Sequence, residues 1–348
     1  MWYHNNGLGV MVLRKLFYAV WTIIGIMIII VFIVVGIGLW RVVTPPEFKV
    51  TSLGIVDDNG YPAIRIVFET DKYPITFKLL APQGKEIYTY IATKGEKLVH
   101  LHLTPLAPYT NVIGPQKYVV KVFYMESELA SLDITVEGVK PVIRIVSIET
   151  KPLFADLLVE KLFVKIRNDG DAPLYISDIP KNIKVFFDDE EVVCAVNETV
   201  ITPGEEKAVT IKSTISIPAN TLDREHVITV AVGGARAKFM IPKLALEINA
   251  IEYNLKEVLG QKYVTNMTIT ITNTWDYPIR IDWITMYIGN ENHGSISMYI
   301  RKTKTTKEVL EPGKSREYIL EFPPFNVKPG STVEFYVGEA LISSLTIK

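Results

Sequence analysis

Residues 168–179 read NDGDAPLYISDI, and residues 273–284 read NTWDYPIRIDWI. The two stretches align at an offset of 105 residues, and a fainter third copy, TDKYPITFKLL, lies at 70–80. Each copy follows one strand-like segment and begins the next, so the chain contains an internal repeat with a period near 100 residues. The aligned positions are Asn168 with Asn273, Asp171 with Asp276, Ile176 with Ile281, and Pro74 with Pro173 and Pro278.

The sequence around these stretches predicts short strands separated by turns. Segments such as MTITITN at 267–273 alternate polar with apolar residues and are rich in β-branched side chains, which is typical of half-buried strands. About seven such strands per repeat is the size of an immunoglobulin-like sandwich. We therefore predict an all-β protein with one N-terminal transmembrane α-helix and three tandem Ig-like β-sandwiches, at 46–138, 140–242 and 244–348. The joints at 136–141 and 241–243 are very short, which favours a semi-rigid rod.

An apolar run precedes the repeats. Residues 16–40 read LFYAVWTIIGIMIIIVFIVVGIGLW and contain no charge. As a helix this run is about 37 Å long, whereas the hydrocarbon of a bilayer is roughly 30 Å thick. A cleaved signal peptide would have a shorter core followed by a small-residue site, and LWRVVTPP offers none. We therefore predict a retained transmembrane helix at 16–40, in contact with the lipid bilayer.

The basic residues around the apolar run predict its orientation. Arg14 and Lys15 precede it, whereas only Arg41 follows it closely. The positive-inside rule then places a short N-terminus, residues 1–15, in the cytoplasm and the C-terminal region outside the cell. Translation starting at Met11 instead of Met1 would shorten the cytoplasmic part further. We predict a single-pass protein of the cell membrane.

Composition limits the class of partner. Residues 42–348 contain all 38 acidic residues and 34 of the 37 basic ones, so their net charge is −4. A nucleic-acid-binding surface needs a basic surplus, so we expect no nucleic-acid partner. Cys194 is the only cysteine, which excludes an intrachain disulfide. The scarcity of Gln and Cys is typical of proteins from thermophiles.

The order strand, Asn-x-x-Asp-x-Pro, strand, then Pro-Gly and an alternating strand resembles known surface modules. It is similar to the CARDB-type adhesion modules and the related LEA14-like sandwiches of archaeal and bacterial surface proteins, chiefly over residues 140–348. The resemblance implies a binding, adhesion or scaffolding role outside the cell, and it brings no catalytic residues. A sandwich fold does not by itself define a function.

Motifs for catalysis are absent from the sequence. It contains no G-x-S-x-G, H-E-x-x-H, P-loop or dinucleotide-binding motif. We therefore expect no enzyme activity, and we assign no catalytic, cofactor-binding or metal-ligating residue.

A candidate patch for binding a partner lies in the first repeat. Tyr88 and Tyr90 alternate with apolar residues at 87–91, as do His100 and His102 at 99–103. If the two strands pair as a hairpin about Gly95, the four side chains form one exposed aromatic and imidazole surface. Such a surface suits a glycan or a protein. A metal shared by the two histidines, a solvated sheet face and a contact with the second repeat are the alternatives.

Three other features have a functional and a structural interpretation. Asn197 and Asn266 begin Asn-x-Thr motifs, which accept glycans on exported proteins. The acidic turns at 57–60, 169–171 and 188–191 supply either calcium ligands or ordinary turn residues. Trp275 and Trp283 are predicted as core residues in preference to a platform for sugars.

Together these features predict a membrane-anchored extracellular binding or scaffold protein. Adhesion, envelope display and an accessory subunit of a membrane complex all fit, with an envelope or membrane protein as partner. A pilin-like filament subunit is an alternative, since pilins combine a basic residue, an apolar helix and a β-rich head. Leu16 follows Lys15, which counts against the usual processing. An ectodomain receptor or enzyme is a third possibility.

Overall fold

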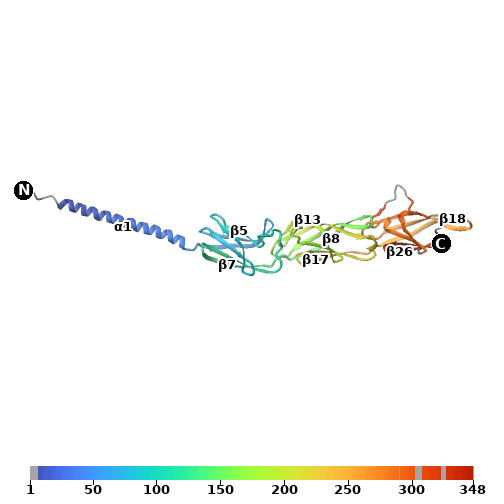
Figure 1. The fold of residues 1–348 in the computed structure, drawn as a ribbon, viewed down its shortest axis with the longest axis horizontal. Coiled ribbons are helices and arrows are strands. Elements are labelled where there is room, and N and C mark those ends of the chain that lie inside the picture. The colour runs from blue at the N-terminus through green and yellow to red at the C-terminus, as the bar shows by residue number, and fades with distance from the viewer. Residues whose placement is uncertain (1–6, 290, 302–307, 323–326, 348) are drawn as a thin grey trace, which may run out of the picture. The chain divides into compact units, whose positions relative to one another are not determined.

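The computed structural model describes residues 7–289, 291–301, 308–322 and 327–347 (Figure 1). Helix α1 spans Gly7–Val43, so it extends beyond the predicted 16–40 segment at both ends. Its Val20–Ile37 segment has a mean hydropathy of 3.1, and none of that segment is buried. The helix is therefore long and apolar enough to cross a membrane. Residues 1–6 and the side chains of Arg14, Lys15 and Arg41, on which the predicted orientation rests, lie outside the described residues.

The first strand set forms two sheets. One has the order β1-β2-β5 and the other the order β4-β3-β6-β7. The strands are β1 Phe48–Asp58, β2 Tyr61–Thr70, β3 Ile75–Leu80, β4 Glu86–Ala92, β5 Leu98–His102, β6 Gln116–Tyr124 and β7 Ser127–Val136. We call this set the first sandwich.

The second sandwich also has two main sheets, with the orders β13-β15-β9-β8 and β12-β11-β16-β17, and a small β10-β14 pair. Its strands are β8 Pro141–Leu153, β9 Asp156–Asn168, β10 Leu174–Ile176, β11 Ile183–Phe187, β12 Glu190–Val192, β13 Cys194–Val196, β14 Thr199–Ile201, β15 Glu206–Pro218, β16 His226–Val232 and β17 Ala235–Ile241. A short 3-10 helix, η1 Ala219–Thr221, follows β15.

The third sandwich repeats this plan, with the sheets β18-β19-β24 and β22-β21-β25-β26 and a small β20-β23 pair. Its strands are β18 Leu246–Val258, β19 Gln261–Asn273, β20 Ile279–Arg280, β21 Ile284–Ile288, β22 Glu291–Ser295, β23 Val309–Leu310, β24 Ser315–Glu321, β25 Thr332–Val337 and β26 Ala340–Thr346. Two 3-10 helices, η2 Ile281–Trp283 and η3 Ile296–Met298, complete it.

The strand order defines the fold class. In an immunoglobulin sandwich, strands A, B and E share one sheet, and strands C, F and G form the other, which strand C′ can extend. All three strand sets follow this rule, with the orders A-B-E and C′-C-F-G in the first and third sandwiches. The second sandwich adds a strand D beside E. The protein is therefore all-β with one N-terminal helix and Ig-like sandwiches in series, as predicted.

Residue contacts divide the chain into two compact units. The first comprises 1–54, 65–101 and 117–134, and the second comprises 55–64, 102–116 and 135–348. One end of the first sandwich thus belongs to the same unit as the second and third sandwiches. That end consists of the β1–β2 turn and the loop after β5.

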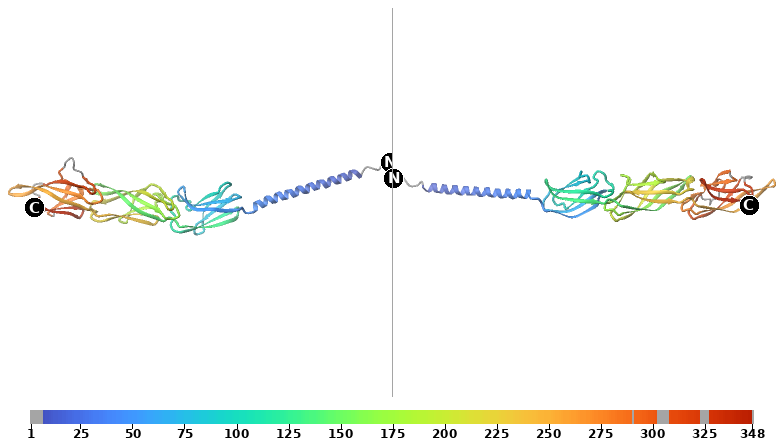
Figure 2. Two further views of the ribbon diagram at one scale, coloured as in Figure 1. Left: turned by 180° about the vertical axis from the view of Figure 1, so that it is seen from behind. Right: turned by 90° about the horizontal axis from the view of Figure 1, so that it is seen from below.

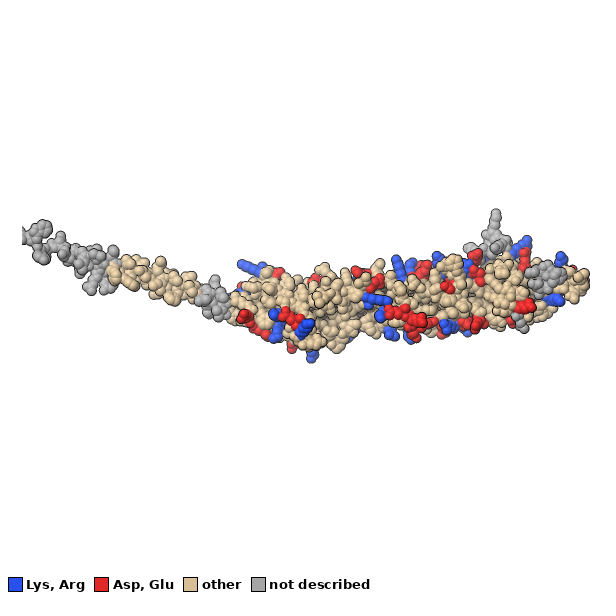
Figure 3. All heavy atoms as spheres, viewed as in Figure 1, with Lys and Arg blue, Asp and Glu red and all other residues tan. Residues whose placement is uncertain are grey.

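Alternation along the strands builds the core. On β9, Val164 and Ile166 are buried, whereas Lys165 and Arg167 are exposed. Each fully buried large aliphatic or aromatic side chain contributes about 1.5–3 kcal/mol relative to exposure. Lys and Arg are interspersed with Asp and Glu on the visible face of the sandwiches (Figure 3).

The repeat seen in the sequence is also a repeat of contacts. The Asn168 side chain is wholly buried and donates to the carbonyl oxygens of Ala172 (2.7 Å) and Ile201 (3.2 Å). Its Oδ1 accepts from the backbone N–H groups of Gly170 (3.1 Å) and Lys140 (3.3 Å). One amide thus satisfies four backbone groups where β9 ends.

Asn273, at the aligned position, makes the equivalent contacts in the third sandwich. Its buried amide donates to the carbonyls of Tyr277 (2.9 Å) and Leu310 (3.0 Å), and its Oδ1 accepts from the N–H of Trp275 (3.0 Å). The Pro-Gly turns match as well. Gly204 donates to the carbonyl of Asn168 at 2.7 Å, and Gly313 donates to that of Asn273 at 2.8 Å.

Candidate functional site

The predicted hairpin between residues 87–91 and 99–103 is not formed. Strand β4, with Tyr88 and Tyr90, pairs with β3, whereas β5, with His100 and His102, belongs to the sheet β1-β2-β5. In an Ig-like sandwich, the connection after C′ crosses from one sheet to the other, so a short turn here does not join paired strands. The predicted pairing was wrong, and the four side chains are divided between two sheets.

The tyrosines of β4 are half-buried, whereas Glu86, Thr89 and Ile91 of this strand are exposed. The Tyr90 hydroxyl donates to Glu96 Oε1 at 3.0 Å, which raises the pKa of the phenol. The Thr93 N–H and that same hydroxyl lower the pKa of the Glu96 carboxyl. Tyr90 thus closes the turn that follows its own strand.

His102 of the predicted patch contacts a carboxylate and an aromatic ring. Its Nε2 lies 2.9 Å from Asp58 Oδ2, and its ring stacks on Tyr61 with centroids 4.6 Å apart. His102 therefore connects the end of β5 to the turn between β1 and β2. Within the described residues, no three His, Cys, Asp or Glu side chains lie close enough to hold a metal ion.

The two glycan-acceptor motifs differ in their surroundings. Asn197 is exposed in the two-residue loop between β13 and β14. Asn266 is half-buried in β19, where its Oδ1 accepts from the Asn254 amide at 2.6 Å. The Asn197 amide is therefore the more accessible to a modifying enzyme.

The carboxylates of the acidic turns bond to the chain's own backbone and side chains. Asp171 accepts from the N–H of Glu137 (2.9 Å) and that of Gly138 (2.8 Å). Asp188 accepts from the N–H of Val227 at 2.9 Å and lies 2.8 Å from Nδ1 of the buried His226. These oxygens act as turn and cap acceptors.

Asp171 belongs to a turn that binds the segment leading into its own sandwich. We call 70–74, 168–173 and 273–278 the junction turns. In the second of them, Gly170 packs on the linker so closely that a Cβ would overlap the carbonyl oxygen of Gly138. The third has Trp275 at the aligned position, and its indole N–H donates to Pro242 O at 2.9 Å.

The first junction turn also forms hydrogen bonds with the segment that leads into its sandwich, which here follows the apolar helix. Asp71 Oδ1 accepts from the N–H of Glu47 at 2.9 Å. The Lys72 ammonium donates to the carbonyl and the hydroxyl of Thr44, at 2.6 and 2.8 Å. All three junction turns therefore bind the chain where it enters their sandwich.

A second set of contacts joins successive sandwiches inside the second unit. The side chain of Asn111, from the loop after β5, donates to the carbonyl of Tyr175 (3.0 Å) and accepts from its N–H (2.7 Å). The wholly buried Tyr175 hydroxyl donates to Asp57 Oδ1 at 2.7 Å. Burial and this bond raise the pKa of Tyr175 far above its usual range. A buried aromatic residue that makes three hydrogen bonds thus anchors this joint.

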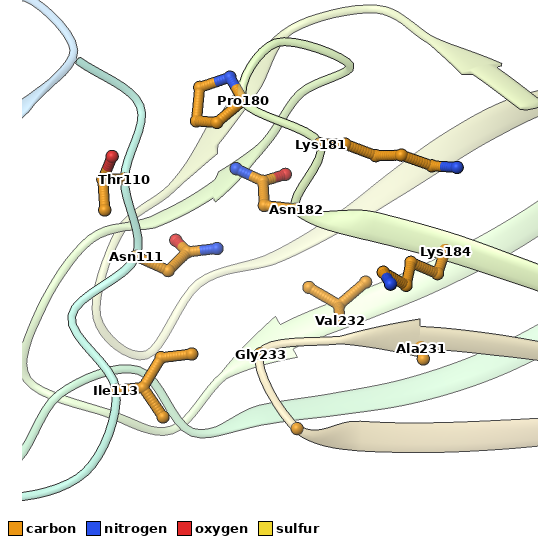
Figure 4. Close-up of a pocket in the computed structure, with 11 residues that line it drawn as sticks. Thr110, Asn111, Ile113, Pro180, Lys181, Asn182, Lys184, Ala231, Val232 and Gly233 are labelled. Atoms are coloured by element: carbon orange, nitrogen blue, oxygen red, sulfur yellow. The ribbon is translucent and has the colours of Figure 1, made fainter. Parts of the chain in front are cut away.

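A shallow groove of about 360 Å³ lies beside this joint (Figure 4). Asn111 and Asn182 line it, but their amides are already bonded, that of Asn182 to the carbonyl of Tyr109 at 3.0 Å. Lys181 and Lys184 also line it and pair with Glu191, whose pKa they lower. These polar side chains that line the groove are thus bonded to other groups of the chain, and the groove belongs to the joint.

Both tryptophans of the sandwiches lie at the joint between the second and third sandwiches. Trp275 is 3% and Trp283 7% exposed. The Trp283 indole N–H donates to the Phe154 carbonyl, at the tip of the β8–β9 turn, at 2.5 Å. Both tryptophans are buried, as predicted. The carbonyl that accepts from Trp283 belongs to the preceding sandwich, and the one that accepts from Trp275 belongs to the linker between the two sandwiches. The feature of the sequence that could have indicated this joint is the pair of tryptophans within the repeated stretch 273–284.

Comparison with protein-family models and with curated proteins found no match. Among solved structures, one titled "3Ig structure of titin domains I67-I69 E-to-A mutated variant" is 11% identical, with a TM-score of 0.25, over 88% of this chain and 100% of that one. The Pseudomonas aeruginosa CupB2 chaperone is 12% identical, with a TM-score of 0.17, over 53% of this chain and 90% of the chaperone chain. The strand order, and not these likenesses, defines the class as tandem Ig-like sandwiches behind one apolar helix. The resemblance to CARDB-type modules stays a prediction.

Proposed function

We propose that this chain is a single-pass, membrane-anchored surface protein with a binding or scaffold role. Helix α1 is the anchor, the N-terminus is cytoplasmic, and the sandwiches are outside the cell. The role is non-catalytic: the sandwiches hold a contact surface at a distance from the bilayer.

The bonded junctions carry this proposal. A flexible linker would let each sandwich move independently, whereas here the entry segments at Thr44–Glu47, Glu137–Gly138 and Pro242 are each bonded to a junction turn. Each such bond is worth about 0.5–1.5 kcal/mol, or more where a charged group takes part. Bonds at all three junctions favour one orientation of the chain as it enters a sandwich, which suits a spacer that presents a binding surface.

The apolar helix supports the anchoring part of the proposal. A core helix of a soluble protein would bury its apolar side chains, but none of the Val20–Ile37 segment is buried. A signal sequence has the same composition and position. The fate of residues 1–40 in the mature protein therefore decides between anchor and leader.

The test is to wash membranes with alkaline carbonate and to sequence the N-terminus of the mature chain. An anchored protein stays in the pellet and keeps the helix. A new N-terminus beyond Trp40 would contradict the anchor, because the helix would then be a cleaved leader. A new N-terminus near Leu16 would favour a processed filament subunit.

Crosslinking on intact cells tests the scaffold part. We expect envelope or membrane proteins to be recovered with the chain after a membrane-impermeant crosslinker is applied. Recovery of cytosolic proteins alone would contradict the proposed topology.

A further inference from the structure

The first residue of the turn between the first two strands has a left-handed backbone conformation in each sandwich. The turn residues Asn59, Phe154 and Leu259 have φ angles of 51°, 49° and 51°. Non-glycine residues rarely adopt this left-handed region. We call these three turns the A–B tips, at residues 57–60, 152–155 and 257–260.

The first two A–B tips accept a hydrogen bond from an aromatic side chain of the next sandwich. Asp57 accepts from the buried Tyr175 hydroxyl at 2.7 Å, and the Phe154 carbonyl accepts from the buried Trp283 indole at 2.5 Å. Both donors follow the junction turn of their sandwich. One element thus makes the same kind of contact at both joints.

The third A–B tip is exposed to solvent. Leu259 is 97% exposed, and on the same hairpin Leu255 is 43% and Ile251 53% exposed. In Figures 1 and 2 the β18–β19 hairpin protrudes past the other strands of the third sandwich. The Tyr263 hydroxyl on β19 donates to Gln261 Oε1 at 2.7 Å, directly after this tip.

We propose that the third A–B tip is a docking site for a β-sandwich domain of another protein. The tip would recognise a tyrosine hydroxyl or a tryptophan indole N–H of the partner domain. This donor would lie beside the turn that connects strands B and C of that domain, as the junction turns do here. It donates to the Leu259 carbonyl or the Glu257 carboxylate, while apolar side chains cover Leu259 and Leu255. The inference rests on the proposed surface role, since the partner must reach the outer part of the chain.

A second copy of this chain is a poorer occupant. Through the alignment of Pro74 with Pro173 and Pro278, the first sandwich has Thr76 and Leu79 at the positions of Tyr175 and Trp283. Neither side chain is an aromatic donor, and Leu79 is wholly buried. Head-to-tail docking of two copies would therefore lack the bond that both internal joints contain.

The experiment is site-specific photocrosslinking of the full-length chain in its native membrane. A benzophenone amino acid replaces Leu259 in one variant and Leu106 in a control, because Leu106 is equally exposed, at 98%, but lies far from the tip in sequence. We expect about tenfold more adduct from position 259, mapping to a turn of a β-sandwich in another protein that contains Tyr or Trp. Leu259→Asp, in a chain with the crosslinker at Leu255, should lower the yield about tenfold, since it buries an unpaired carboxylate.

Three outcomes would overturn the inference: equal adduct yields at 259 and 106, an adduct with a second copy of this chain, or an adduct with a protein that has no β-sandwich. Carbonate extraction of the same samples shows whether the chain is still anchored. An anchored chain without a tip adduct contradicts the docking site alone, whereas an unanchored chain contradicts the proposed function.

Discussion

Asn168 and Asn273 are the residues on which the junction turns depend most. Each is wholly buried and satisfies backbone groups that come from separate parts of its sandwich. A buried backbone group that loses its partner costs about 1–3 kcal/mol, so an amide with several partners is hard to replace. Alanine keeps the fold's shape at this position but offers neither donor nor acceptor.

We expect Asn168→Ala to lower the local stability of the second sandwich by at least about 2 kcal/mol, because it leaves the Ala172 and Ile201 carbonyls unpaired. Hydrogen exchange of the β9 and β15 amides measures this change. The matched control is Asn197→Ala in an exposed loop, with an expected change within about 0.5 kcal/mol. Equal effects of the two substitutions would contradict this role of Asn168.

Asp188 gives the second sandwich a defined response to acid. Burial opposes its charge, but the Val227 N–H and His226 outweigh burial and lower the pKa of the carboxyl below its usual 3.8. A depressed carboxyl pKa adds stability above the unfolded-state value, and this stability is lost as the pH falls through the folded-state pKa. Asp188→Asn should therefore destabilise β16 at about pH 7 and have a smaller effect at about pH 2. Urea unfolding at both pH values measures the difference, and a pH-independent effect would contradict the assignment.

At the scale of elements, the linker before the second sandwich depends on the absence of a side chain at Gly170. A Cβ there would overlap the Gly138 carbonyl oxygen and lie 2.7 Å from the Lys140 nitrogen, and both atoms are backbone. We expect Gly170→Ala to cost about 2–3 kcal/mol, as overpacking does. Faster hydrogen exchange of the Val139 and Asp171 amides would reveal this loss of stability. The Val139 N–H donates to the Val112 carbonyl, and the Asp171 N–H donates to the Gly138 carbonyl.

Gly54→Ala is the matched control for this prediction. Gly54 lies in β1, where a Cβ would have no neighbouring atom within 4 Å, and it needs no left-handed backbone. Its substitution should leave stability unchanged or raise it slightly, because alanine loses less backbone entropy on folding. An effect of Gly54→Ala as large as that of Gly170→Ala would mean that contact with the linker is not the cause.

Sequence patterns predicted the strands and the repeated turn because both are local. Alternation along β9 or β19 depends on one buried face, and the Asn-x-x-Asp-x-Pro turn closes within a few residues. The predicted hairpin between residues 87–91 and 99–103 was wrong because a short connection can either join neighbouring strands or cross between sheets. Trp275 and Trp283 were expected in a core, and their place at a joint depends on the neighbouring sandwich, which no single repeat encodes.

At the scale of the whole molecule, one apolar helix and Ig-like sandwiches in series define the architecture. The apolar surplus of the composition is concentrated in α1, whereas the sandwiches combine buried β-branched residues with charges of both signs. The proposed role joins these two parts: the helix holds the protein in the bilayer, and the sandwiches present a surface outside.

A cysteine at position 106 tests this topology most directly. The variant Leu106→Cys places a thiol at a 98% exposed position, whereas the native Cys194 is half-buried and burial raises the pKa of its thiol. The measurement is labelling of intact cells with a membrane-impermeant maleimide, followed by carbonate washing. We predict that L106C is labelled about tenfold faster than the unmodified protein and that the labelled chain stays in the membrane pellet. Labelling only after the cells are broken open, or a labelled chain released by the wash, would contradict a membrane-anchored surface protein.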